Sequence, residues 1–192
     1  MTKNLTAANQ LTILRMLLIP AFVILMMYGY RGWALVTFLT AGVTDMLDGL
    51  IARSTGQNTE LGAWLDPMAD KLLLVTMFIV LTLPGIGSAN QLPLWFTVLV
   101  ISRDVAIVGT VAVFNLAVGP RTFRPSVFGK IATATYIFTG VITLYFNYLG
   151  QPTRVVTAFI YASLVITFIS AGHYLFQVFR LANSGEAPSR GA

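Results

Sequence analysis

With 192 residues, of which 56% are hydrophobic and only 10% are charged, the chain has too few polar side chains to cover a soluble domain, in which about 25% are charged. Its net charge of +5 comes largely from residues at the ends of apolar runs, and this scattered pattern argues against a nucleic-acid partner. The absence of cysteine and the single histidine, His173, exclude disulfides and thiolate or multi-histidine metal sites, so any metal would need oxygen ligands.

Six apolar segments follow one another along the chain, and each is long enough to cross about 30 Å of hydrocarbon as a helix. They lie at approximately 11–29, 33–53, 65–83, 93–117, 127–149 and 155–180. The loops between them are short, which predicts antiparallel neighbours in one bundle. We therefore expect an all-α, polytopic membrane protein. Its six-transmembrane-helix bundle would be one domain over residues 1–182, followed by a disordered polar tail over 183–192.

The start of the chain does not have the pattern of a cleavable signal peptide, because Met1 to Gln10 is polar and no small-residue cleavage site follows a short apolar stretch. The first apolar segment is therefore interpreted as a retained span. Ahead of it, Thr2 to Arg15 mixes polar residues with leucine and isoleucine. This part is predicted to be either a short N-terminal interfacial helix or a frayed terminus.

The basic residues predict the orientation in the membrane. With the N-terminus inside, the cytoplasmic side would hold Lys3, Arg53, Arg121, Arg124, Lys130, Arg180 and Arg190. The opposite side would hold only Arg31 and Arg154. This asymmetry predicts that both termini of an integral, multi-pass protein lie in the cytoplasm, with a bacterial inner or plasma membrane as the location.

Acidic residues are concentrated in and beside the second and third apolar segments. The four residues of this group are Asp45, Asp48, Asp66 and Asp70. Each carboxylate within a membrane costs about 2.5 kcal/mol or more unless it is compensated. The neighbouring Arg53 and Lys71 cannot neutralise four negative charges, whereas divalent cations can.

The spacing of these aspartates favours a shared site. Asp45 and Asp48 are three residues apart, and Asp66 and Asp70 are four apart, so each pair lies on one face of its helix. Two antiparallel helices joined by a short link, 53–65, could present both pairs to one point. That arrangement suits two hard cations about 3.5–4 Å apart, as used for displacement at phosphorus. The alternatives are aspartates at helix ends in water, or a Na⁺ or H⁺ site in a transporter.

The same residues spell a longer pattern. Asp45-x-x-Asp48-Gly49-x-x-Ala52-Arg53, then eight residues, then Gly62-x-x-x-Asp66-x-x-x-Asp70 resembles the signature of the CDP-alcohol phosphotransferases. The six-span layout is also similar to that family. The run Leu65-Asp66-Pro67-Met68-Ala69-Asp70-Lys71 and the motif Asn9-x-x-Thr12-x-x-Arg15 resemble the phosphatidylglycerophosphate synthase branch.

This resemblance implies a function and a role for each matched residue. The family transfers a phosphatidyl group from CDP-diacylglycerol to an alcohol and releases CMP, with two divalent ions, Mg²⁺ or Mn²⁺, at a cytoplasmic site. Asp45 and Asp66 would bridge the metals, while Asp48 and Asp70 would each complete one metal site. Asp70 would also be the catalytic base. The CDP part of the donor would contact Gly49, Arg53, Thr59 and Asn9. The family also implies a homodimer.

Basic residues in and between the fourth and fifth segments are the candidates for binding the acceptor alcohol. Glycerol 3-phosphate would need a cationic pocket, for which the candidates are Arg103, Arg121, Arg124 and Lys130. For Arg121 and Arg124 the alternative is plain membrane anchoring, and for Arg103 it is a structural ion pair with Asp104. This Arg-Asp pair replaces an expected Arg-Glu pair and resembles eukaryotic-type cardiolipin synthases, whose acceptor is phosphatidylglycerol. Inositol phosphate is a further alternative.

Two other classes of protein share some of these features. Prenyltransferases that cleave prenyl diphosphates also use intramembrane aspartates with Mg²⁺, but they need two distant aspartate motifs and about nine spans. A small cation transporter would need more spans and repeat symmetry than this chain offers. His173, in the sixth segment, is expected to be a packed or hydrogen-bonded residue and not a catalyst.

Overall fold

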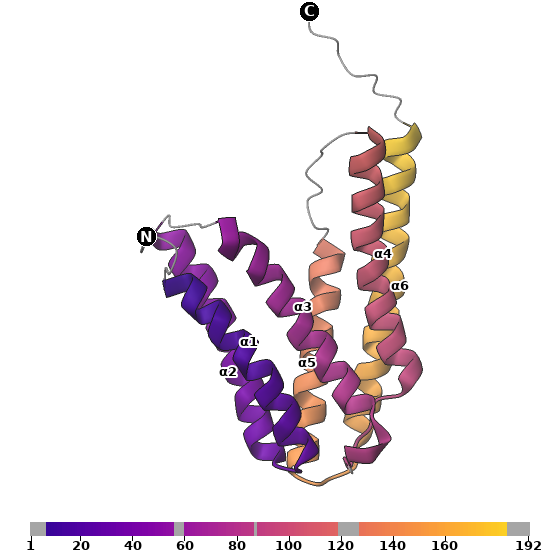
Figure 1. Ribbon diagram of the computed structural model, residues 1–192. Helices are drawn as coiled ribbons and strands as arrows, with labels where there is room; N and C mark the ends of the chain where they lie inside the picture. Colours follow the sequence, from indigo (N-terminus) through magenta and orange to yellow (C-terminus); the bar gives the residue numbers. More distant parts are fainter. Residues whose placement is uncertain (1–6, 56–59, 87, 119–126, 184–192) are drawn as a thin grey trace, which may run out of the picture.

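The computed structural model describes residues 7–55, 60–86, 88–118 and 127–183, and it describes the side chains of 10–45, 68–86, 88–110, 127–174 and 176. These residues form α-helices and one short 3₁₀-helix, as the all-α prediction requires (Figure 1). The α-helices are α1 (Ala7–Met27), α2 (Arg31–Thr55), α3 (Glu60–Thr82), α4 (Leu94–Val118), α5 (Val127–Tyr148) and α6 (Arg154–Asn183). The 3₁₀-helix η1 covers Pro84–Ile86, between α3 and α4.

The polar stretch between the second and third helices is more helical than its composition predicts. The expected link covered 53–65, but α2 continues to Thr55 and α3 begins at Glu60. Polar side chains mark where a helix leaves the hydrocarbon, and they do not interrupt its backbone hydrogen bonds as proline does. Both helices therefore extend past their apolar parts, and the predicted link was too long.

The first helix tests part of the prediction that a short interfacial helix or a frayed terminus precedes the first apolar segment. α1 runs without interruption from Ala7 to Met27, so no separate interfacial helix precedes the apolar segment within the part of the chain that is described. The rest of that prediction, and the predicted tail beyond Asn183, lie outside the described residues. After α1 the chain reverses through Gly29, whose φ of 78° is readily adopted only by glycine.

Three helices are long and apolar enough to cross a membrane, among the residues that are described. They are Gln10–Met27 in α1, Val127–Tyr148 in α5 and Arg154–Tyr174 in α6. The sequence predicted six. In α2, α3 and α4 the described side chains cover shorter stretches, and those of α3 include the charged pair Asp70 and Lys71. The observed features are those of a membrane protein.

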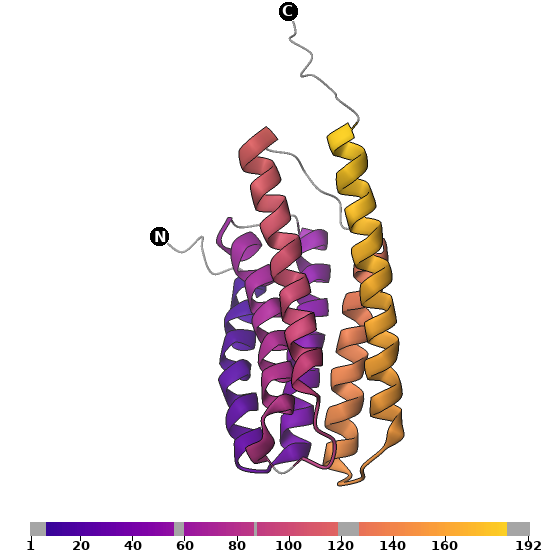
Figure 2. The same ribbon diagram turned by 90° about the vertical axis from the view of Figure 1, so that its right-hand side faces the viewer.

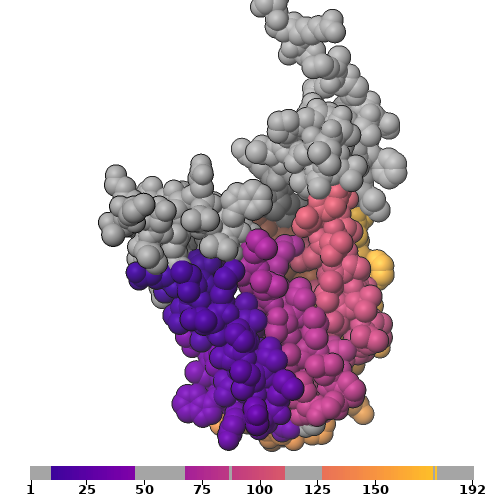
Figure 3. Space-filling model, in the orientation of Figure 1, coloured from indigo at the N-terminus to yellow at the C-terminus, as the bar shows by residue number. Residues whose placement is uncertain are grey.

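The packing order of the helices places three of them around the candidate site. α1 packs against both α2 and α3, α2 also contacts α5, and α5 pairs with α6 (Figures 1 and 2). α4 contacts α3 and α6, and Figure 3 shows α1, α3 and α4 next to one another across one face. Aromatic residues fill the centre, where the Phe78 ring meets the rings of Phe96 and Tyr136 edge-on. Their burial joins the helices into one core.

The end of the bundle opposite the aspartates is fastened by two buried asparagines. The backbone N–H of Asn90 donates to Asn147 Oδ1 at 2.7 Å, and Asn147 Nδ2 donates back to the Asn90 carbonyl at 3.0 Å. The Asn90 side chain also donates to the Gln151 carbonyl and accepts from the Thr153 N–H, each at 2.8 Å. These bonds tie the loop before α4 to the end of α5 and the start of α6.

Gly140 on α5 packs against the side chain of Met77 on α3. A Cβ atom on Gly140 would lie 2.0 Å from Met77 Cε and 2.3 Å from its Sδ, and Met77 is fully buried, so its side chain has little room to move. We expect Gly140→Ala to destabilise the protein by about 1–3 kcal/mol through overpacking. A lower thermal midpoint in detergent would show this. Gly172→Ala is the matched control, because a Cβ there meets nothing within 4 Å; equal midpoints for the two variants would contradict the prediction.

Candidate active site

A buried arginine joins two of the predicted site residues. The Nη1 atom of Arg15, on α1, lies 2.8 Å from Asp45 Oδ1 on α2 and also contacts Asp70 Oδ1 on α3. The arginine side chain is 0% exposed, whereas those of Asp45 and Asp70 are 44% and 42% exposed. The arginine thus reaches the carboxylates from the interior, while the carboxylates remain accessible from outside.

The local sequence explains why Arg15 lies where it does. It follows Thr12 by three residues on α1, so the two share a face, and both are fully buried. A guanidinium in an apolar interior is strongly destabilising unless it is paired. Since α1 packs against α2 and α3, that face of the helix meets the acidic faces of both neighbours.

Sequence reasoning assigned no role to Arg15, although it noted the residue within a motif. The missed signal is physical. An arginine inside an apolar helix must find an anionic partner, and the acidic cluster on the next two helices is the nearest source. Arg15 is therefore a candidate counter-ion of the aspartates on the same grounds as Arg53 and Lys71.

The other two aspartates follow the same helices. Asp48 lies in α2 three residues after Asp45, and Asp66 lies in α3 four residues before Asp70. Both backbone positions are about one helical turn nearer the end where α2 stops and α3 begins. Their side chains lie outside the described residues. Accordingly, no group of three or more potential metal ligands is found among the described side chains, and convergence of all four remains a prediction.

Several other predicted site residues also lie outside the described part. This is true of the side chains of Asn9 and Arg53 and of the surroundings of Gly49, although the backbone of all three is helical. It is true of the whole of Thr59, Arg121 and Arg124. Their predicted roles are therefore untested by the structure.

The described carboxylates suit a divalent cation. Oxygens from Asp45 and Asp70, on different helices, meet at one positively charged nitrogen. Two carboxylate groups that converge on one cation in this way can share another, and hard oxygen ligands are those that Mg²⁺ and Mn²⁺ prefer. The residues present therefore fit a divalent metal ion.

A second charged cluster connects α3, α4 and α6. Asp104 on α4 accepts from Lys71 Nζ at 3.2 Å and from Arg103 Nη1 at 2.9 Å. Arg103 Nη2 also lies 3.4 Å from Ser170 Oγ on α6, and its side chain is mostly buried. The ion pair between Arg103 and Asp104, one of the alternatives raised by the sequence, is thus present. Because Lys71 follows Asp70 directly, this cluster adjoins the aspartates.

The remaining described candidates differ in their surroundings. Lys130 is exposed near the start of α5, and the carbonyl of the preceding Gly129 lies 3.5 Å from Arg103 Nη2. The Arg103 side chain therefore reaches the backbone next to Lys130. The His173 ring packs edge-on against Phe128, with centroids 4.9 Å apart, in agreement with the packing role expected for it.

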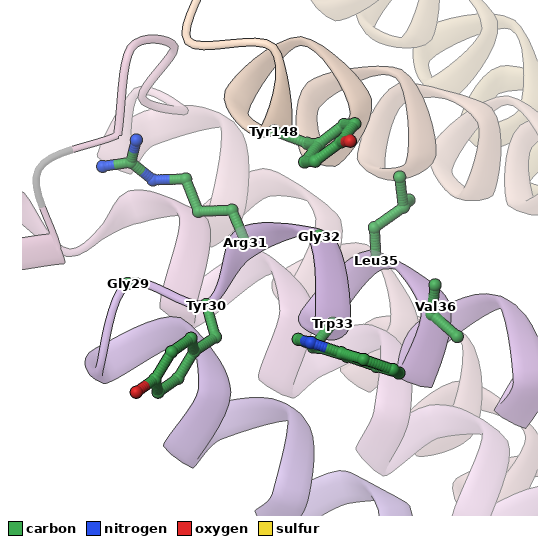
Figure 4. Close-up of a pocket in the computed structure, with 8 residues that line it drawn as sticks. All are labelled: Gly29, Tyr30, Arg31, Gly32, Trp33, Leu35, Val36 and Tyr148. Carbon is green, nitrogen blue, oxygen red and sulfur yellow. The ribbon is translucent and has the colours of Figure 1, made fainter.

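A pocket of about 620 Å³ lies away from the aspartates, at the start of α2. Figure 4 shows the Tyr148 ring over Gly32, while Arg31 and Tyr30 point away from that ring. Asp45 lies in the other half of α2, and none of the predicted site residues lines this pocket. The volume therefore belongs to a different part of the molecule from the candidate site.

Comparison with known proteins connects this geometry to a family. Residues 5–169 match the family model described as CDP-alcohol phosphatidyltransferase. The chain is 34% identical over 182 residues to a Mycobacterium tuberculosis protein named "Probable phosphatidylglycerophosphate synthase", a match that covers 90% of this chain and 81% of that protein. It is 32% identical over 174 residues to the "CDP-diacylglycerol--glycerol-3-phosphate 3-phosphatidyltransferase" of Haemophilus influenzae, covering 86% and 89% of the two chains.

The chain is also similar to a relative that is named as a cardiolipin synthase. The chain is 31% identical over 199 residues to a Drosophila melanogaster protein named "Probable cardiolipin synthase (CMP-forming)", with 91% of this chain and 60% of that protein covered. The relatives thus carry both names that the sequence motifs indicated. The resemblance stated from those motifs is confirmed.

Proposed function

Because the chain belongs to the CDP-alcohol phosphatidyltransferase family, we propose that it transfers the phosphatidyl group of CDP-diacylglycerol to an alcohol and releases CMP. The observation that carries the proposal is the meeting of Asp45 and Asp70 at one cationic nitrogen. Family membership favours this chemistry over prenyl transfer and over cation transport.

Glycerol 3-phosphate is the acceptor that we propose, giving phosphatidylglycerophosphate. The Haemophilus influenzae relative is named for that acceptor. The Arg103 side chain reaches the backbone carbonyl beside Lys130 and shares Asp104 with Lys71, the neighbour of Asp70. An arginine can hold a phosphate by two parallel hydrogen bonds. Arg121 and Arg124 would add to this cationic region.

Phosphatidylglycerol is the second candidate acceptor, and a specific observation favours it. The Arg103–Asp104 ion pair at 2.9 Å engages a nitrogen that a small anionic acceptor would otherwise use. A match to a relative named as a cardiolipin synthase points the same way. Inositol phosphate remains a third option that the acceptor panel below includes.

The family generally uses divalent metal, and we assign two ions, Mg²⁺ or Mn²⁺, to Asp45, Asp48, Asp66 and Asp70. When bound, they neutralise the pyrophosphate of the donor and make CMP a better leaving group. Asp70 takes the proton from the acceptor hydroxyl. The hydroxyl oxygen then bonds to the phosphorus that carries the diacylglycerol, the bond from that phosphorus to the CMP oxygen breaks, and CMP leaves with its electron pair.

Binding of the nucleotide part is assigned to residues around the aspartates. Gly49 would allow the CDP group to approach the backbone of α2 closely, and Arg53 and Thr59 would contact it from the end of that helix and the following link. Asn9, near the start of α1, would complete the contacts. We further propose a six-span layout with the site and both termini on the cytoplasmic side, and a homodimer.

A panel of acceptors tests the reaction and the acceptor together. Purified protein with CDP-diacylglycerol and Mg²⁺ or Mn²⁺ is expected to release CMP with glycerol 3-phosphate and not with serine. Phosphatidylglycerol and inositol phosphate complete the panel, and mass spectrometry of the lipid products identifies the acceptor. CMP release with phosphatidylglycerol alone would establish the cardiolipin synthase reaction instead, and no CMP with any acceptor would contradict the proposal.

A further inference from the structure

We propose that Arg15 is an internal counter-cation of the active site: it holds Asp45 and Asp70 together before a divalent ion binds, and it competes with that ion for them. The inference deepens the proposed function, on whose metal site its second half rests. Its first half, the assembly of the site without metal, depends only on the contacts of the arginine itself.

The geometry of the contacts points to this role. A single nitrogen, Arg15 Nη1, is within ion-pair distance of carboxylate oxygens on two different helices. That is the position of a bridging cation. Each aspartate contributes its Oδ1 atom to this contact, so an ion that takes the same oxygens has to share them with the guanidinium or displace it.

Burial gives the two cations separate routes to the carboxylates. Arg15 is completely buried, whereas Asp45 and Asp70 are each more than two-fifths exposed. A divalent ion that accompanies a diphosphate donor can therefore reach the aspartates from the open side.

The positive charge of Arg15 determines how its loss should change the stability of the metal-free protein and the affinity for metal. Carboxylates held near one another repel, and the guanidinium offsets that repulsion when no metal is present. Once a divalent ion is bound, the same guanidinium is a like charge beside it and weakens its binding. Loss of the positive charge should therefore destabilise the metal-free protein and tighten metal binding. A residue that only oriented the carboxylates would have the opposite effect on metal affinity.

Arg15→Gln separates these roles. Full-length protein in detergent is examined by thermal unfolding in chelator and during titration with Mn²⁺ alone. We expect a lower midpoint in chelator than in the unaltered protein, a larger rise on adding Mn²⁺, and an apparent Mn²⁺ affinity at least roughly tenfold higher. Arg154→Gln is the matched control, since Arg154 is exposed at the start of α6; it should leave both values unchanged.

The variant is purified both with and without Mn²⁺, because the proposal requires the ion to replace the missing charge. Failure to obtain folded Arg15→Gln protein even with saturating Mn²⁺ would overturn it, and so would an unchanged or weaker Mn²⁺ affinity. CMP release by the unaltered protein is measured separately. Absence of that release would refute the proposed reaction, whereas the Mn²⁺ titration reports on the counter-cation by itself.

Discussion

Asp70→Asn is expected to lower the rate of CMP release by at least about a thousandfold, because one substitution removes a proton acceptor and a negatively charged metal ligand. Asparagine has nearly the same size as aspartate and can still accept a hydrogen bond from Arg15, which contacts Asp70 Oδ1. The fold and CDP binding should therefore be largely retained. Steady-state CMP release, a thermal midpoint and a CDP-binding isotherm together measure these effects.

Asp104→Asn provides the comparison for this result. Asp104 is also an acidic residue on an apolar helix, and its ion pairs with Lys71 and Arg103 would be weakened in the same way. It makes no described contact with Arg15, so its loss should reduce the rate by roughly tenfold or less. Near-normal turnover by Asp70→Asn would remove Asp70 from the role of base.

Removal of divalent metal is expected to abolish CMP release, with recovery on addition of Mg²⁺ or Mn²⁺. The donor carries a pyrophosphate, and the carboxylates of Asp45 and Asp70 lie close to its expected position, so the reaction without a divalent ion brings like charges together. Stabilisation of that charge by metal is worth several kcal/mol, which is about a thousandfold or more in rate. The measurement is the initial rate after dialysis against a chelator, followed by titration with each metal.

Two controls accompany the metal experiment: added salt without a divalent ion, and substitution of a predicted metal ligand. Potassium chloride at matched ionic strength screens charge without coordinating the aspartates, so it should not restore the rate. Asp45→Asn should raise the metal concentration needed for half-maximal rate, because it removes one ligand charge. Full activity in excess chelator would rule out the metal-dependent mechanism.

Much of the fold follows from the apolar segments. Each predicted segment corresponds to a helix whose ends differ from the expected ones by a few residues, apart from the early start of α3 at Glu60. The sequence prediction began this helix at 65 because the residues before it are polar. Polar residues mark the edge of the hydrocarbon, and they do not end a helix. The choice of neighbours, such as α1 against both α2 and α3, could not be predicted, because α1 is apolar on most of its faces.

The candidate site was predictable in its acidic half. The i, i+3 and i, i+4 spacings place each aspartate pair on one helix face, and they led directly to Asp45 and Asp70. The role of Arg15 depends on which helix covers that face, and the sequence does not contain this information in local form. For Arg103 the neighbouring Asp104 raised the ion pair as an alternative, while its approach to Ser170 on α6 required the tertiary fold.

The hydrogen bonds of Asn90 and Asn147 restrain the end of the bundle that lies opposite the aspartates. Asn90 and Asn147 bind one another and the loop leading into α6, while Figure 1 shows α1 and α2 diverging from α4 and α6 toward the opposite end. Because these bonds join the loop before α4 to α5 and to the loop before α6, any displacement of that loop relative to the two helices must break them.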